Sequence, residues 1–193
     1  MRHLRTMIIL SVTCVMATLI GLGTAGTARA TIVNAPGYVH LQVYRPGTCV
    51  DAQYAAPGTA IVMWRCLNTE FEEWQKVEVP IPGNRYEHCA CTTASMFINH
   101  AMNLCTAVEN NTNDTVDSGI PVVQQTCNTS DEKQWWLLPK VTYSPGGGLI
   151  KSFTIKEKVL DVDSGRADNG VPLQVWTNHL NPNQLWYPPA GCC

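Results

Sequence analysis

Short runs of strand-forming residues, separated by turn residues, recur along the chain, and apolar and polar residues alternate in the run at 38–44. The clearest runs cover residues 38–44, 61–64, 122–125, 153–155 and 173–176. A period of two is typical of half-buried β-strands, and no stretch after residue 30 shows a helical period. Turn pairs such as Pro46-Gly47, Pro57-Gly58 and Asn169-Gly170 end or separate these runs. The sequence therefore predicts an all-β fold.

The first thirty residues have a different character. Arg2 and Arg5 precede an apolar run over residues 7–23, and Ala28-Arg29-Ala30 has the A-x-A form of a cleavage site. We interpret residues 1–30 as a secretory signal peptide, so the mature, extracellular chain is expected to start near Thr31. No other apolar run is long enough to span a membrane, and we expect no membrane insertion.

The remaining residues are expected to form one domain. It would cover residues 38–188, after an N-terminal arm at 31–37 and before a cysteine-containing tail at 189–193. Residues 1–30 hold three arginines and no acid, so ten basic and 15 acidic residues remain, a net charge of about −5. This acidic balance argues against nucleic acid or anionic lipid as a partner.

Three similar units follow one another along the chain, at about 38–79, 95–140 and 149–188. Cys49, Cys105 and Val159 take corresponding positions, 56 and 54 residues apart. The tryptophans that close the units, Trp74, Trp136 and Trp186, are 62 and 50 residues apart. Such spacing indicates an internal repeat. The third unit has the fullest motif: Leu160-Asp161-Val162, then Gln174-Val175-Trp176, then Asn183-Gln184-Leu185-Trp186.

This motif resembles the repeat of the ricin-type β-trefoil lectins. That repeat reads Cys-Leu-Asp-Val, then Gln-x-Trp about a dozen residues later, then Asn-Gln-x-Trp. The resemblance covers nearly the whole mature chain and implies a β-trefoil of three Gln-x-Trp repeats that binds carbohydrate. Val159 and Asn178 stand where the family has a pair of cysteines, so both partners of that bridge are missing together.

The resemblance also assigns roles in the third repeat. Asp161 and Asn183 would hydrogen-bond sugar hydroxyls, Trp176 would stack on the sugar ring, and Gln174 and Gln184 would assist. Taken singly, Asp161 would also suit a turn and Trp176 a strand core; together with the amides they favour binding. The closing tryptophans Trp74, Trp136 and Trp186 are expected in the structural core.

The other two repeats depart from this set. The first keeps Asp51 and Trp64, but Val62 stands in place of Gln174, and Phe71-Glu72 in place of Asn183-Gln184. We interpret it as a degraded or altered second site. The second repeat has Ala107 and Gln125 at the acid and indole positions. It should not bind sugar in this way.

Eight cysteines remain after residue 30: Cys49, Cys66, Cys89, Cys91, Cys105, Cys127, Cys192 and Cys193. An even number in a secreted chain predicts disulfides rather than a metal site. The resemblance implies the bridges Cys49–Cys66 and Cys105–Cys127. Cys89, Cys91, Cys192 and Cys193 would pair in an order that the sequence does not fix. The alternatives are a zinc cluster with His88, which is less favoured, and a bridge from the tail to a partner protein.

The sequence gives little support for catalysis. It has no nucleophile elbow, His-Glu metal motif or phosphate-binding loop, so we expect neither enzyme activity nor a cofactor. We therefore predict a secreted lectin for galactose-type glycans. The alternatives are a cell-binding subunit of a secreted toxin or enzyme complex, or a trefoil without lectin activity such as a protease inhibitor. Asn110, Asn113 and Asn128 begin N-x-Ser/Thr sequons.

Overall fold

The computed structural model describes residues 36–43, 47–53, 56–83, 91–109, 118–140, 147–166, 168–187 and 191–193. The strands in these ranges are β1 (Tyr38–Val39), β2 (Thr48–Asp51), β3 (Val62–Arg65), β4 (Trp74–Pro80), β5 (Thr93–Asn99), β6 (Leu104–Val108), β7 (Ile120–Thr126), β8 (Trp136–Leu137), β9 (Lys151–Ser152), β10 (Lys158–Val162) and β11 (Val171–Thr177). The 3-10 helices are η1 (Glu132–Gln134), η2 (Asp163–Gly165) and η3 (Pro182–Gln184). The all-β prediction is confirmed. None of the described helices is long and apolar enough to cross a membrane.

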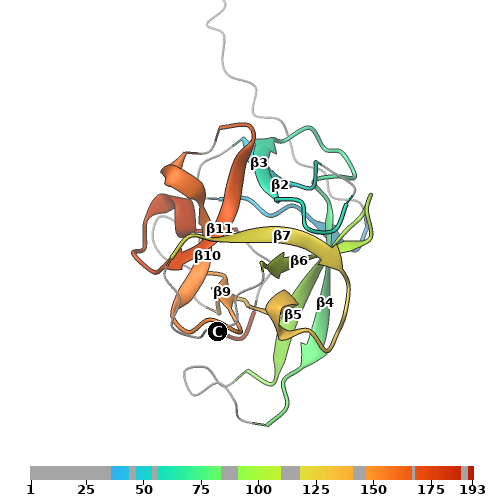
Figure 1. Cartoon of the computed structure of the whole chain (residues 1–193), viewed down its shortest axis with the longest axis vertical. Helices are drawn as coiled ribbons and strands as arrows, with labels where there is room; N and C mark the ends of the chain where they lie inside the picture. The colour runs from blue at the N-terminus through green and yellow to red at the C-terminus, as the bar shows by residue number, and fades with distance from the viewer. Residues whose placement is uncertain are drawn as a thin grey trace, which may run out of the picture.

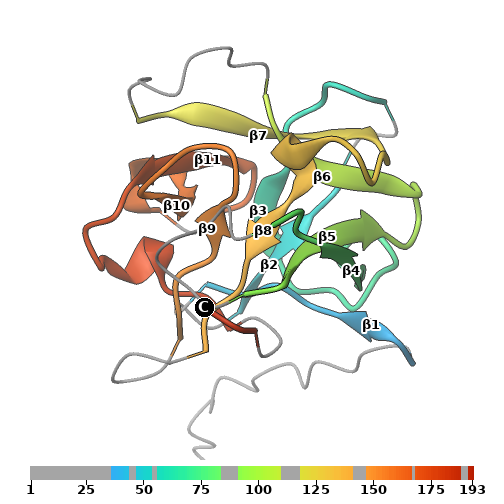
Figure 2. The same ribbon diagram turned by 90° about the horizontal axis from the view of Figure 1, so that it is seen from below.

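Each repeat contributes one antiparallel hairpin. These are β2–β3, β6–β7 and β10–β11, in chain order. The hairpins also contact one another: β11 pairs with both β3 and β7, and Ala60 bridges to Val123. Figures 1 and 2 show β3, β7 and β11 side by side. The three hairpins therefore close on one another around a common centre.

The other strands form a closed ring. Strand β4 pairs with β1 and β5, and β8 pairs with β5 and β9. Trp186 closes the ring, because it bridges Val43 on one side and Gly148 on the other.

The closing tryptophans lie at the centre of the core and have at most 1% of their surface exposed. Each indole N–H donates a hydrogen bond into the hairpin of its own repeat. Trp74 bonds the Val50 carbonyl at 3.0 Å, Trp186 the Leu160 carbonyl at 2.8 Å, and Trp136 the Thr106 hydroxyl at 2.8 Å. A buried indole needs such a partner, so these bonds attach the ring to the hairpins.

Some strand boundaries differ from the sequence prediction. The strand expected at residues 153–155 is wrong: β9 is the preceding pair Lys151–Ser152. The Ser152 hydroxyl accepts the Ile155 N–H at 3.3 Å, and the Lys158 N–H bonds the Ile155 carbonyl. These bonds close a turn that reverses the chain into β10.

The first predicted strand is also shorter than expected, because β1 ends at Val39. Tyr44 and the turn residue Pro46 lie outside the described residues. Strand β4 extends to Pro80, one residue beyond the first unit expected at about 38–79.

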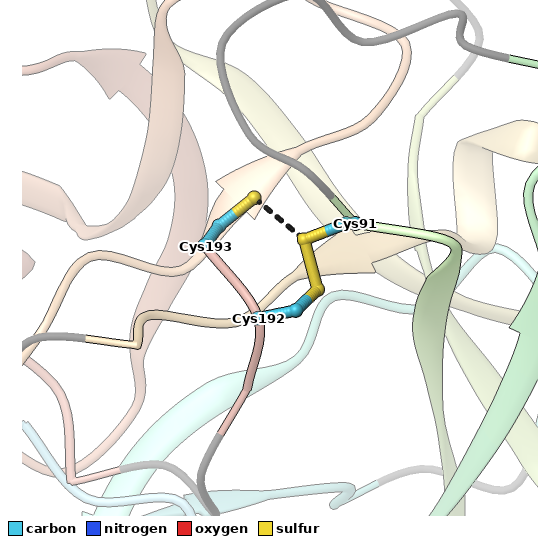
Figure 3. Close-up of side chains that lie close together, drawn as sticks. All are labelled: Cys91, Cys192 and Cys193. Carbon is cyan, nitrogen blue, oxygen red and sulfur yellow. Dashed lines mark hydrogen bonds between the residues drawn. A yellow bond between two sulfur atoms is a disulfide. The ribbon is translucent and has the colours of Figure 1, made fainter.

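Two disulfides each close a hairpin, and a third connects segments that are distant in sequence. Cys49–Cys66 and Cys105–Cys127 each bridge the two strand ends of one hairpin, as the resemblance implied. A third bridge, Cys91–Cys192, ties the tail to the segment before β5 (Figure 3).

Cys193 is also disulfide-bonded, to a residue outside the described ranges, and Cys89 lies outside those ranges as well. Backbone bonds hold the tail against the segment after β8, from Gly191 to the Pro139 carbonyl and from Cys193 to the Leu138 carbonyl. An ideal Cβ on Gly191 would lie 2.3 Å from the Cβ of Leu138, so only glycine fits there.

Candidate functional site in the third repeat

The hairpin β10–β11 brings the acid and the first amide together. Asp161 on β10 is directly opposite Gln174 on β11. The Gln174 Nε2 donates a hydrogen bond to Asp161 Oδ1 at 2.9 Å. Trp176 follows two residues further along β11, so its side chain lies on the same face as Gln174. Strand register therefore places three of the predicted site residues next to one another.

Helix η3 supplies the other two amides. Asn183 Nδ2 donates to Asp161 Oδ2 at 2.8 Å and to the Val162 carbonyl at 3.0 Å. Gln184 Nε2 donates to Asp161 Oδ2 at 2.8 Å and to the Thr177 carbonyl at 2.9 Å. The three predicted amides thus meet at the carboxylate of Asp161, and Trp176 lines the same cleft.

Burial and hydrogen bonding act in opposite directions on that carboxylate. Only 3% of Asp161 is exposed. Burial raises its pKa above the ordinary 3.8, and the charge of Asp163 adds to this; the bonds from Gln174, Gln184 and Asn183 counteract the rise. The amides therefore stabilise the charged form, which is a strong hydrogen-bond acceptor.

A turn from the second repeat supports the indole of Trp176. Ser118 Oγ accepts the Thr177 N–H at 2.9 Å, and Lys158 Nζ donates to Ser118 Oγ at 3.1 Å. An ideal Cβ on Gly119 would lie 3.1 Å from Trp176 Cζ3, and Gly119 has a positive φ of 98°. Glycine is therefore the residue that lets this turn pack against the half-buried indole.

The five side chains line an open cleft of about 250 Å³. Sequence reasoning missed its remaining lining residues, which are Asp163, Ser164, Gly165, His179 and Asn181. They belong to helix η2, which follows β10 directly, and to the segment between β11 and η3, and no motif marked them. The cleft combines a charged acceptor, amides and an aromatic face, a set that suits a neutral, hydroxyl-rich ligand.

The predicted residues do not all face the cleft equally. Gln184 is only 1% exposed, and its Oε1 accepts the His179 N–H at 2.8 Å while its Nε2 bonds Asp161. It therefore positions the acid and the loop. Gln174, Trp176 and Asn183 are half-buried and remain accessible beside Asp161.

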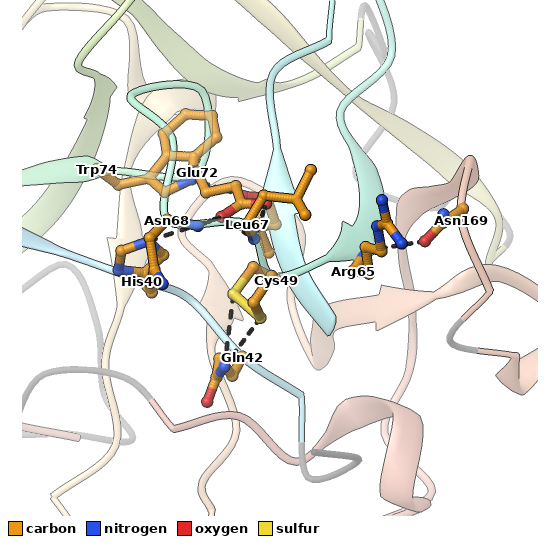
Figure 4. Close-up of a disulfide and its surroundings, with 11 residues drawn as sticks. His40, Gln42, Cys49, Arg65, Leu67, Asn68, Glu72, Trp74 and Asn169 are labelled. Atoms are coloured by element: carbon orange, nitrogen blue, oxygen red, sulfur yellow. Dashed lines mark hydrogen bonds and ion pairs between the residues drawn. A yellow bond between two sulfur atoms is a disulfide. The ribbon is translucent and has the colours of Figure 1, made fainter. Parts of the chain in front are cut away.

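The first repeat keeps the same register. Asp51 is opposite Val62, and Trp64 is opposite Cys49. Glu72 occupies the place of Gln184, and its carboxylate accepts the Leu67 N–H at 2.9 Å (Figure 4). The acid and indole are thus present, but no side-chain amide of the described residues reaches the acid.

The second repeat has the frame of the site without its functional groups. Ala107 is opposite Val123, and Gln125 is opposite Cys105. Gln134 Nε2 donates to the Thr126 carbonyl, as Gln184 does to Thr177. The sequon residue Asn128 is exposed, whereas Asn110 and Asn113 lie outside the described residues.

Three sulfur atoms gather at the tail in a way that resembles a metal cluster. The Sγ atoms of Cys91, Cys192 and Cys193 lie within 4.8 Å of one another, and those of Cys91 and Cys193 are 3.0 Å apart (Figure 3). All three cysteines are disulfide-bonded. A disulfide sulfur carries no thiolate charge, so these residues fit a covalent clasp and not a zinc site.

Comparison with known proteins agrees with this geometry. The family model described as the ricin-type β-trefoil lectin domain matches residues 37–186. The chain belongs to this family. It therefore contains a carbohydrate-binding domain of a non-catalytic type. No curated protein sequence matches the chain.

Several solved structures share the fold of this lectin domain. ThreeFoil, a designed protein with three-fold symmetry, is 18% identical with a TM-score of 0.62, over 78% of this chain and 96% of that one. The Rhizoctonia solani agglutinin is 20% identical with a TM-score of 0.59, over 81% and 96% of the two chains. A ricin B-like lectin of Macrolepiota procera, solved with lactose, is 14% identical with a TM-score of 0.55, over 81% and 96%. The predicted β-trefoil is confirmed.

Proposed function

We propose that this protein is a secreted lectin that binds galactose-type glycans mainly through its third repeat. The observation that supports this most directly is the buried carboxylate of Asp161, held by three amide donors beside the half-buried indole of Trp176. Ligand hydroxyls would donate to the carboxylate, and the apolar face of a sugar ring would cover the indole.

The preference for galactose-type sugars rests on the family resemblance. The fold relative from Macrolepiota procera was solved with lactose, which agrees with this preference. One shallow site with a few hydrogen bonds and one stacked ring gives about 4–5 kcal/mol, or roughly millimolar affinity. Useful avidity would then come from dense glycans or from several copies of the protein.

A glycan array tests this proposal, with the chain after Ala30 displayed multivalently. The wild-type protein should bind galactose-type glycans, and Asp161→Ala and Trp176→Ala should each abolish that signal. Gln125→Ala is the matched control for the indole, because Gln125 takes the same strand position in the second repeat. If the folded wild-type protein bound no glycan on the array, the lectin hypothesis would be excluded, and a trefoil that acts on a protein would be favoured.

Secretion has a separate test. Residues 1–35 lie outside the described residues, so the expected cleavage after Ala30 rests on the sequence alone. N-terminal sequencing of the exported protein should give Thr31 as the first residue. An uncleaved product in the cytoplasm would contradict this part of the proposal.

The alternative of a partner linked through the tail is less well supported. Cys192 bonds Cys91 of the same chain, and Cys193 is also disulfide-bonded. A bridge to another protein would first have to break one of these bonds. A thiol titration of the denatured mature protein should find no free cysteine, whereas one free thiol would reopen the alternative.

A further inference from the structure

The first repeat has a buried acid whose surroundings differ chemically from those of Asp161. Asp51 is 6% exposed, and no hydrogen bond within the described part of the chain reaches its carboxylate. In the third repeat, Asp161 has three amide donors although it is exposed to only 3%. Asp51 retains its small exposure, so its carboxylate can receive a hydrogen-bond donor from outside the chain.

The substitutions around Asp51 explain why its donors are missing. Val62 replaces the amide opposite the acid, and Phe71 replaces the amide from the following turn. Glu72 replaces the buried glutamine with a second acceptor. It is completely buried, and its oxygens accept backbone N–H groups of Leu67 and Asn68 at 2.8–2.9 Å.

The charge of Glu72 therefore adds to that of Asp51. Burial, and then the charge of Glu72, raise the pKa of Asp51 to about 6, so Glu72 adds negative potential at the Asp51 carboxylate. His40 lies beside Glu72, with Nε2 3.8 Å from Glu72 Oε2, but burial lowers the pKa of His40 (Figure 4). It is therefore a poor source of compensating charge at neutral pH.

An aromatic surface accompanies the two acids. Trp64 lies on the same strand face as Val62, which is opposite Asp51, and it is half-buried. The turn of the third repeat packs beside the indole, where an ideal Cβ on Gly170 would lie 3.8 Å from Trp64 Cζ3. An indole face attracts cations, and it does so more strongly where water is partly excluded.

We propose that the first repeat binds a primary ammonium group, through Asp51 and the face of Trp64, with the buried charge of Glu72 strengthening the attraction. An amino sugar with a free amino group or an aliphatic amine would provide this chemistry. An ammonium has three donors and no acceptor, so it suits a carboxylate that lacks donors. Ca²⁺ fits less well, because it needs six to eight oxygens and those of Glu72 already accept backbone hydrogen bonds.

The two binding modes can be separated by ligand. Galactose, galactosamine, N-acetylgalactosamine and butylammonium would each be titrated at pH 7 into ¹⁵N-labelled mature protein, with the indole N–H signals assigned through Trp64→Phe and Trp176→Phe. Galactosamine should shift the Trp64 signal. The affinity read from this shift should be about tenfold lower for N-acetylgalactosamine, which corresponds to about 1.4 kcal/mol. Butylammonium distinguishes the two kinds of ligand. If it shifts the Trp64 signal as much as galactosamine does, the site takes aliphatic amines; if the shift is smaller, the site takes an amino sugar.

Variants test which acid is responsible. Asp51→Asn, which keeps the shape of the side chain, should remove the Trp64 response to galactosamine, and Glu72→Gln should weaken it several-fold. Glu78→Gln is the control, because Glu78 is an exposed acid on β4, away from the turn that packs against Trp64, and it should leave the response unchanged. If Trp64 responds to no ammonium compound, or responds equally to galactose, the proposal is wrong. Neither result depends on the response of Trp176 in the third repeat.

Discussion

The first and third repeats present an acid and an indole in the same strand register. Hydrogen-bond donors surround the acid of the third repeat, whereas an apolar residue and an acceptor lie beside the acid of the first. Asp161 receives hydrogen bonds from Gln174, Asn183 and Gln184, whereas Asp51 faces Val62 and a buried glutamate. The same frame thus produces one site rich in donors and one rich in acceptors.

Glu72 shows which part of the glutamine the fold requires. In the third repeat, the oxygen of Gln184 holds the loop through the His179 N–H, and its nitrogen holds Asp161. Glu72 keeps the first task, since it accepts the Leu67 N–H, but a carboxylate has no nitrogen for the second. The fold therefore tolerates the change, and its effect falls on the binding site.

The largest expected effect is on the third repeat. Asp161→Asn removes the charged acceptor and turns one oxygen into an N–H₂ group that meets the amide donors. Hydrogen bonds to charged groups contribute about 1.5–3 kcal/mol, so affinity for a galactose-type glycan should fall about 10- to 100-fold. Calorimetric titration measures the change, with Asp168→Asn as the control. Unchanged affinity would mean that the glycan binds elsewhere.

A second variant converts the third repeat towards the first. Gln184→Glu keeps an acceptor for the His179 N–H but loses the donors to Asp161 and to the Thr177 carbonyl. We expect the free energy of unfolding at pH 7 to fall by about 1–3 kcal/mol, because two buried acceptors lose a partner. The pKa of Asp161 should rise further, and glycan binding should weaken.

Urea denaturation and an NMR titration of the side-chain carboxyl groups measure these two effects. Gln134→Glu is the matched control, because Gln134 has the same backbone contacts but Ala107 stands at the acid position of its repeat. It should lose stability without any effect on glycan binding. Equal loss of binding in both variants would show that the effect is on the fold.

The sequence predicted which five residues of the third repeat come together, because they lie on a repeating frame. Strand pairing puts Asp161 opposite Gln174, and the turn before Trp186 returns Asn183 and Gln184 to the same acid. Such local contacts follow once the repeat is recognised. The three core tryptophans are placed by the same logic, since each one closes a repeat.

The parts that sequence reasoning missed come from contacts between repeats and from loops. Gly119 supports Trp176 from the second repeat, and its role depends on how β11 packs against β7. The sequence showed that Glu72 replaces an amide. It did not show that burial and the charge of Glu72 raise the pKa of Asp51. The strand expected at 153–155 does not form, because the hydroxyl of Ser152 closes a turn there.

The reverse conversion should restore the first repeat in part. Glu72→Gln places an amide nitrogen where Gln184 donates to Asp161, so it should donate to Asp51 and remove the neighbouring charge. The pKa of Asp51 should fall from about 6 towards the ordinary 3.8. An NMR titration of the Asp51 carboxyl carbon tests this, and an unchanged pKa would show that burial alone causes the shift.

The smallest expected effect is a pH-dependent gain in stability from Asp51→Asn. In the wild-type chain the folded pKa of Asp51 is about 6 and the ordinary value is 3.8. The folded state therefore binds the proton more tightly, and this acid lowers stability progressively as the pH rises from about 3.8 to 6.

Asparagine carries no charge and can donate to Glu72, so the variant should be more stable at pH 7 by about 1 kcal/mol after screening by water, and by less at pH 4. Thermal unfolding of both chains at the two pH values measures the contribution of Asp51. A gain of the same size at pH 4 would mean that the asparagine packs better for reasons unrelated to charge, and the first repeat would then differ from the third only in shape.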